Sequence, residues 1–224
     1  AKQVFDRLEL NDEQRGNAQA AFDRGRADDF KRNDELAALR RIGGSHRTYL
    51  PLVLQLQSWA LGANGEISEQ ELTTLISTGR NMHLREVEVQ RLAAIFRSRS
   101  GEQRIEDAYA VLGFKEAASP DEVDKASQAL LKQLDADKLI AQGLPEAMRP
   151  VIEERASEIR RAHETIELTK AFLGDGGRIE HDGEIFEVAD FPALDADVPV
   201  YHAALGKANR RVVARLCDGW IPHN

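Results

Sequence analysis

Cysteine is nearly absent from this sequence, which has Cys217 as its single example in 224 residues. One thiol cannot form an intramolecular disulfide, so we expect an apolar core to hold the fold together. A lone thiol is typical of a reducing compartment. No candidate base lies near Cys217 in the sequence, which argues against a nucleophilic cysteine.

Long apolar runs are also missing. The longest, from Tyr49 to Leu61, is interrupted by Pro51, Gln55 and Gln57. It is shorter than the roughly 20 apolar residues that a membrane-spanning helix needs. We therefore expect a buried core helix here, with Trp59 in the core.

Basic residues are too few for a nucleic-acid surface. Lys and Arg number 30 against 38 Asp and Glu, which gives a net charge of −8 and a pI of about 5.4. We therefore expect no nucleic-acid partner. The sequence also has no Gly-rich phosphate loop, no zinc-type Cys/His cluster and no nucleophile elbow, so we expect neither an enzyme nor a cofactor.

Helical periodicity is the main feature that the sequence does have. With 42% hydrophobic and 30% charged residues it is an ordinary soluble globular chain, and we predict an all-α fold. In residues 1–103, helices are predicted at about 3–9, 11–25, 33–43, 48–62, 68–80 and 84–99. Two of them have start signals, at Asn11 and at Ser68, where Glu71 completes a capping box.

A weak internal repeat is present in this region, because the spacing between Leu10 and Phe22 recurs between Leu84 and Phe96. The segment 63–71, Ala-Asn-Gly-Glu-Ile-Ser-Glu-Gln-Glu, resembles the Ala-Asp-Gly-x-Ile-Ser-x-x-Glu segment that TerB-like helical domains carry twice. The resemblance implies a TerB-like bundle in residues 1–103. Its first copy would begin upstream of the sequence, so we expect this domain to be N-terminally truncated.

Acidic residues in the same segment allow a metal-site hypothesis. Asn64, Glu66, Glu69 and Glu71 could supply oxygen ligands to a hard cation. However, the alternating ligand pattern of a Ca²⁺ loop, with its distal bidentate Glu, is absent. We prefer helix capping with a solvated acidic first turn, which the helix dipole favours, and expect no metal.

Residues 104–173 have the strongest helical pattern. One helix is predicted from Ile105 to Leu112 with Gly113 as its terminator. The run Ser119-Pro120-Asp121-Glu122 opens a second helix, and Pro145 opens a third, longer one. Their apolar stripes are Val123, Ala126, Leu130 and Leu134, and Met148, Ile152, Ala156, Ile159, His163 and Ile166. The two helices should pack antiparallel, with His163 as a hydrogen-bonded core histidine.

This hairpin, preceded by Asp-Ala-Tyr-Ala-Val-Leu-Gly at 107–113, resembles a J domain. The run from Asp137 to Met148 is similar to the C-terminal J domain of the membrane-anchored DnaJ-like protein A family, in which it follows a TerB-like domain. The resemblance implies a J-like domain at 104–173 and a DnaK-type chaperone as partner. It also implies a cytoplasmic protein, tethered to the inner membrane by an N-terminal segment outside this sequence.

J domains stimulate ATP hydrolysis through a His-Pro-Asp loop and a basic face on the preceding helix. The loop positions fall on Asp135, Ala136 and Asp137, so only the last matches. Asp in place of His removes a donor and adds negative charge, and Ala in place of Pro frees φ. The preceding helix has Ser127-Gln128-Ala129 where the family commonly has Tyr-Arg-Lys. The resemblance places the partner-binding surface on Lys125, Gln128, Lys132, Asp135, Ala136, Asp137 and Lys138.

Three functional hypotheses follow from these residues. The first is a non-enzymatic J-like interaction module, acting as adaptor, decoy or scaffold, that has lost stimulation of a DnaK-type chaperone. The second is an active co-chaperone in which Lys125, Lys132, Asp137 and Lys138 still engage the chaperone. The third is a metal protein or enzyme that uses the acidic residues of the TerB-like region.

The tail, residues 174–224, does not resemble J-domain sequence. Its predicted elements are a flexible joint at 174–177, strands at 178–181 and 184–188 around an Asp182-Gly183 turn, and a helix at about 199–217. An isolated hairpin is marginal in water, so we expect the tail to pack on the J-like helices or to bind a partner protein. The tetrapeptide Leu-Asp-Ala-Asp of 134–137 recurs at 194–197.

Overall fold

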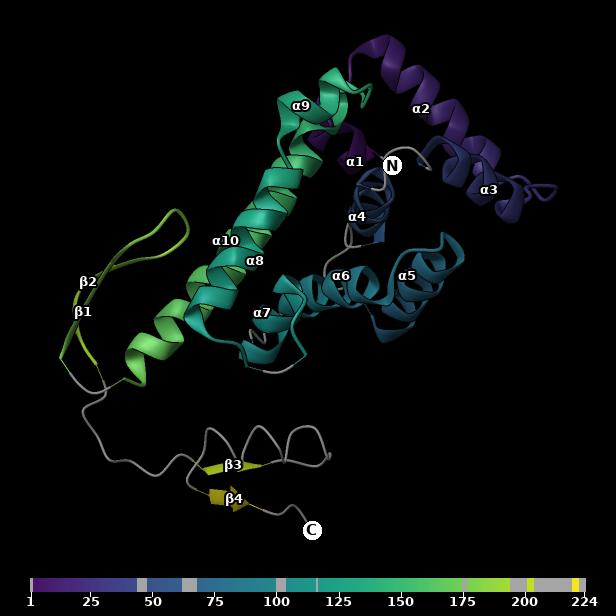
Figure 1. Ribbon diagram of the computed structural model, residues 1–224. Coiled ribbons are helices and arrows are strands. Elements are labelled where there is room, and N and C mark those ends of the chain that lie inside the picture. Colours follow the sequence, from purple (N-terminus) through teal and green to yellow (C-terminus); the bar gives the residue numbers. More distant parts are fainter. Residues whose placement is uncertain are drawn as a thin grey trace.

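The computed structural model is predominantly helical with a small β tail, as predicted (Figure 1). It describes residues 2–43, 48–61, 68–99, 104–115, 117–174, 177–193, 201–203 and 219–221. The first six helices are α1 (Lys2–Arg7), α2 (Asp12–Gly25), α3 (Arg32–Gly43), α4 (Tyr49–Leu61), α5 (Glu69–Asn81) and α6 (Glu86–Arg99). Their ends lie within two residues of the predicted ones. None of the described helices is long and apolar enough to cross a membrane.

Side-chain capping explains where several helices begin. Asn11 and Gln14 exchange hydrogen bonds at the start of α2, with the Gln14 amide 2.9 Å from the Asn11 oxygen. Ser68 and Glu71 do the same at α5. Each capping box satisfies two backbone donors that lack a helical partner. The predicted start signals are therefore confirmed.

A long antiparallel hairpin forms the middle of the molecule (Figure 1). After α7 (Ile105–Leu112), the chain forms α8 (Pro120–Gln133), the short α9 (Ala136–Ala141), the 3₁₀ turn η2 (Glu146–Met148) and α10 (Arg149–Phe172). Gly113 ends α7 with φ of 96°, as predicted. The prediction that Pro145 opens the long helix was wrong, because Pro145 precedes the 3₁₀ turn and α10 begins at Arg149. The sequence prediction also missed α9, which lies in the loop.

The main apolar cluster crosses the predicted domain boundary at residue 103. It combines Leu92 and Ile95 of α6 with Tyr109 of α7, Val123 of α8 and Ile159 of α10, among others. Polar contacts reinforce this junction. The Arg91 guanidinium donates to the Val111 carbonyl at 2.7 Å, and Arg97 forms an ion pair with Asp107. Helix α7 therefore packs against both α6 and α10. Because these contacts join the two sides of residue 103, the domain boundary there stays a prediction.

The tail begins with a β-hairpin that differs in register from the prediction. Strands β1 (Arg178–Asp182) and β2 (Glu187–Pro192) are antiparallel, and Asp182 pairs with Glu187. The connection is therefore the four residues 183–186, and the predicted two-residue turn was wrong. Farther on, β3 (Tyr201–Ala203) pairs in parallel with β4 (Gly219–Ile221). The helix predicted at about 199–217 was wrong at β3, and its parts at 199–200 and 204–217 lie outside the described residues.

Glu164 of α10 explains the wider hairpin loop. Its carboxylate, with a side chain only 8% exposed, accepts hydrogen bonds from the Glu184, Ile185 and Phe186 amides at 2.8 to 3.2 Å. His181 lies 3.4 Å away. A β-carbon on Gly183 would clash with this carboxylate. The loop is thus shaped around a buried anion. The β1–β2 hairpin docks on α10, which lies in the segment on which one of the two predicted alternatives placed the tail.

Acidification should loosen this docking. Burial pushes the pKa of Glu164 up, but the hydrogen bonds from Phe186, His181, Ile185 and Glu184 outweigh it and hold the pKa below 4.5. Because the pKa is lower in the folded chain, the stabilisation is present at neutral pH and is lost as pH falls through the lowered value. We expect the amide proton resonances of Ile185 and Phe186 to titrate in NMR spectra at a lower pH than an unperturbed glutamate would.

The matched variants for this titration are both on α10. Glu164→Gln should abolish it, because the amide side chain does not ionise. Glu158→Gln removes a carboxylate beside Arg161 instead and should preserve the titration. Equal behaviour of the two variants would contradict the role given to Glu164.

Candidate partner-binding surface

The predicted contact residues on α8 form one exposed stripe. Lys125, Gln128 and Lys132 are all exposed and lie three and four residues apart, so they share a helix face. The opposite face carries the buried Val123 and Ser127. The structure therefore brings the three polar residues together on the outside of the hairpin.

The predicted loop residues lie at the start of α9. Asp135 is its N-cap, with an oxygen 3.0 Å from the Lys138 amide. Ala136 is the first helical residue and is half-buried, and Lys138 is exposed. The loop is therefore a helix start, in which the side chain of Asp135 is engaged by its own backbone.

Asp137 is held from the other side of the loop. Its carboxylate lies 2.9 Å from Arg149, although the side chain is 87% exposed. Arg149 also pairs with Glu146 at 2.7 Å. The hydrogen bonds that Arg149 donates, first to Glu146 and second to Asp137, raise the pKa of its guanidinium group. Such exposed pairs add little stability, but this one orients the carboxylate toward the start of α10.

The inner side of the loop packs on the N-terminal helices, which the sequence did not predict. Leu139 and Leu144 lie in a second apolar cluster with Val4 of α1 and Tyr49 of α4. The Tyr49 hydroxyl lies 3.4 Å from the Leu139 carbonyl and 3.2 Å from that of Gln142. The only sequence signal was the apolar character of Leu139 and Leu144, which pattern alone could not assign to a partner.

A cation–π contact closes the same junction. The Arg7 guanidinium lies 3.7 Å from the centre of the Trp59 ring and forms an ion pair with Glu154 of α10. Trp59 is buried in the N-terminal part of the chain, as predicted. The α9 end of the hairpin is thus bound to α1 and α4, which lie beside it in Figure 1.

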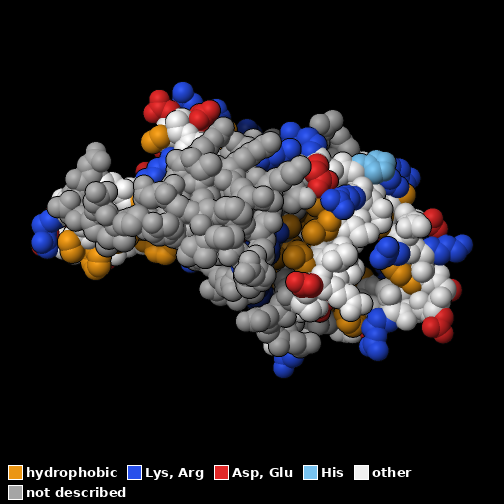
Figure 2. Space-filling view, turned by 90° about the horizontal axis from the view of Figure 1, so that it is seen from below, with side chains coloured by type: hydrophobic (Ala, Val, Ile, Leu, Met, Phe, Trp, Pro, Cys, Tyr) orange, Lys and Arg blue, Asp and Glu red, His pale blue; other side chains and the backbone are white. Residues whose placement is uncertain are grey.

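Charge on the candidate surface is mixed. In α8, the three acidic residues Asp121, Glu122 and Asp124 outnumber Lys125 and Lys132. The view from below in Figure 2 shows that basic and acidic side chains are also interspersed on the described residues of that face. Such a surface would attract an acidic partner less strongly than a continuous basic face would.

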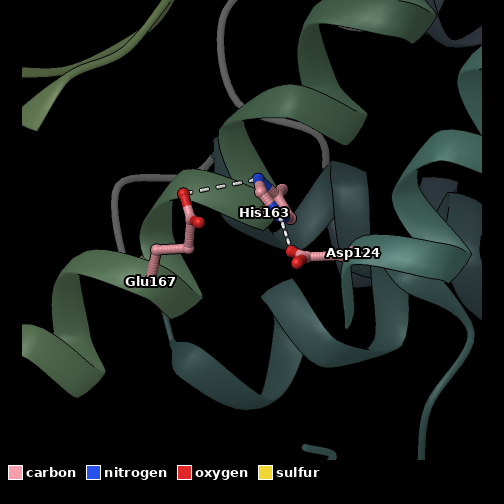
Figure 3. A group of neighbouring side chains, drawn as sticks. All are labelled: Asp124, His163 and Glu167. Carbon is pink, nitrogen blue, oxygen red and sulfur yellow. Dashed lines mark hydrogen bonds and ion pairs between the residues drawn. The ribbon is translucent and has the colours of Figure 1, made fainter. Parts of the chain in front are cut away.

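A cluster of Asp124, His163 and Glu167 links the two long helices (Figure 3). His163 Nε2 lies 2.7 Å from an Asp124 oxygen, and Nδ1 lies 3.5 Å from a Glu167 oxygen. The ring therefore contacts a different carboxylate with each nitrogen. His163 is hydrogen-bonded as predicted, but it is partly exposed, with 22% of its side chain accessible.

The metal hypothesis for the N-terminal region gains no support from the described residues. Asn64 and Glu66 lie outside them, Glu69 is exposed and Glu71 is half-buried. The Glu71 carboxylate accepts from the Ser68 amide at 2.9 Å, which lowers its pKa. Capping accounts for Glu71, and among the described residues only the His163 cluster has metal-ligand spacing.

Removing the contact between His163 and Asp124 should destabilise the packing of α8 on α10. In a double-mutant cycle of Asp124→Ala and His163→Ala, we expect a coupling free energy of about 1 kcal/mol, measured by urea unfolding. The same cycle with Glu167→Ala should give about 0.3 kcal/mol, since that contact is longer and lies within one helix. Equal couplings would contradict the assignment of Asp124 as the main partner.

One family model, described as luciferase-like monooxygenase, matches residues 139–224. The match covers less than half of the chain. The described part of this segment holds α10, the β1–β2 hairpin and the parallel β3–β4 pair, joined through residues 204–218. The parallel pairing of β3 with β4 differs in architecture from the helical hairpin. No solved structure is significantly similar to the chain.

Several curated proteins are similar over most of the chain. Co-chaperone protein DjlA of Aliivibrio fischeri is 30% identical, over 76% of this chain and 69% of that protein. The Photobacterium profundum protein of the same name is 31% identical over 77% and 69%, and that of Vibrio cholerae 31% over 75% and 68%. These names agree with the expected non-enzymatic protein. At this identity and coverage, the chain belongs to the DjlA family of co-chaperone proteins.

Proposed function

We propose that this protein is a J-like interaction module that binds a protein partner but does not stimulate ATP hydrolysis by a DnaK-type chaperone. In this proposal, residues 1–103 are a TerB-like bundle, 104–173 the J-like domain and 174–224 a docked tail. The compartment is the cytoplasm, at the inner membrane. Membership of a co-chaperone family and the α8–α10 hairpin support the general role.

The observation that carries the proposal is the role of Asp135 as a helix cap. The first loop position, where J domains have His, holds a carboxylate that caps α9 through the Lys138 amide. An ionised carboxylate has no proton to donate, and this one already accepts from its own backbone. The position therefore lacks the donor that the resemblance associates with chaperone stimulation.

Two further contacts restrict the loop. Asp137 is paired with Arg149, and the inner side of α9 is covered through Leu139 and Tyr49. A partner can therefore reach only the outer side, where Lys132 and Lys138 are exposed. We assign partner binding to this outer side and to the stripe of α8.

An active co-chaperone is the second candidate. The observation in its favour is that Asp137 keeps the one matching loop residue in an exposed position, with Lys125 and Lys132 exposed on α8. The exposed ion pair between Asp137 and Arg149 is weak enough for Asp137 to exchange it for a contact with a partner.

Single-turnover ATP hydrolysis by a DnaK-type chaperone separates the two candidates. We expect this protein to leave the rate unchanged, because the donor at position 135 is missing. A clear stimulation that Asp137→Ala abolishes would refute the proposal in favour of an active co-chaperone.

Restoring the loop tests which residues account for the loss. Asp135→His with Ala136→Pro should create stimulation, since Lys125 and Lys132 remain exposed and Pro is favoured at the first position of a helix. The matched control is Asp195→His with Ala196→Pro, the same change in the second Leu-Asp-Ala-Asp tetrapeptide. If the folded loop variant gives no stimulation, the assignment of the loss to residues 135 and 136 is wrong.

A further inference from the structure

A cavity of about 230 Å³ lies where the N-terminal helices meet the hairpin. Its walls come from α4, α6, α8 and α10. None of the predicted contact residues lines it, so it is separate from the candidate partner-binding surface. Its polar lining is dominated by three arginines, Arg85, Arg91 and Arg155, with Glu88 as the only carboxylate among the lining residues.

The arginines differ in burial, which gives the cavity an inner end and a rim. Arg155 of α10 is only 5% exposed. Arg91 is half-buried, and Arg85 has 64% of its side chain exposed at the rim. Glu88 pairs with Arg85 at 2.9 Å. Three arginines and one glutamate therefore contribute to the lining, which gives the lining residues a formal excess of two positive charges.

The surroundings of Arg91 make this excess of positive charge energetically unfavourable. Its guanidinium donates to the carbonyls of Val111 and Leu112 at 2.7 and 3.4 Å, which are neutral acceptors. Burial lowers the pKa of Arg91, although Glu88 partly opposes this. An anion in the cavity would favour the charged form, since buried charges are stabilised by close counter-charges.

We propose that this cavity binds a small oxyanion, namely a phosphate or carboxylate compound with at least two negative oxygens. The planar guanidinium fork matches both groups through paired hydrogen bonds. Leu52, Leu130 and Ile159 complete the lining, so a short apolar body can accompany the anion. A bound anion would connect α6 with α10. The proposal does not depend on the J-like function.

Calorimetric titration with inorganic phosphate and with malonate tests the site, at an ionic strength held constant with chloride. We expect saturable binding of at least one probe to one site per chain, with a rise in the thermal unfolding temperature. Tighter binding of phosphate would identify a phosphate ligand, and tighter binding of malonate a dicarboxylate. Absence of saturable binding by both probes would overturn the proposal.

Matched variants locate the binding. Arg85→Gln should weaken it about tenfold, as expected for loss of one charged hydrogen-bonding partner. Arg80→Gln makes the same change at an ion pair with Glu86 outside the cavity and should leave the affinity unchanged. Arg155→Lys keeps the charge but removes the fork, and should also weaken binding. If Arg155→Lys does not fold, the comparison of Arg85→Gln with Arg80→Gln still decides, since equal weakening of binding by both variants would contradict the site.

Discussion

Burial of one face of α10 is the constraint on which the rest of the structure depends. Val151 and Ile152 pack in the cluster with α1 and α4, while Ile159 and Ile166 pack in the cluster with α6, α7 and α8. Each of the four is at most 1% exposed, and burying such a side chain is worth roughly 2 kcal/mol. Near its C-terminal end, the same helix holds the tail hairpin through Glu164.

This arrangement explains why the loop between α8 and α10 is more constrained than a surface loop. Its inner residues belong to the apolar cluster, and its two aspartates are engaged by the Lys138 amide and by Arg149. A loop fixed in this way presents one defined outer face. That suits a protein-binding role, and it keeps the donor-free position 135 in place.

Much of the fold could be predicted because its signals are local. Helix starts at Ser68 and Ser119 depend on residues three positions away, and the stop at Gly113 depends on its own backbone. The candidate residues Lys125, Gln128 and Lys132 were predictable as one stripe, since helical spacing sets their shared face. The register of the β1–β2 hairpin was not predictable, because it depends on the carboxylate of Glu164, twenty residues before Glu184.

By itself, the sequence determined the predominantly helical class, the approximate bounds of α1 to α6, and the acidic character of the loop at Asp135 and Asp137. These follow from periodicity, capping and residue identity, which need no distant partner. Tertiary structure alone decided that α9 packs on α1 and α4 and that three arginines meet in one cavity. It also decided that His163 joins Asp124 across two helices. Such contacts join residues far apart in the chain, and no local pattern specifies which distant apolar or charged groups will meet.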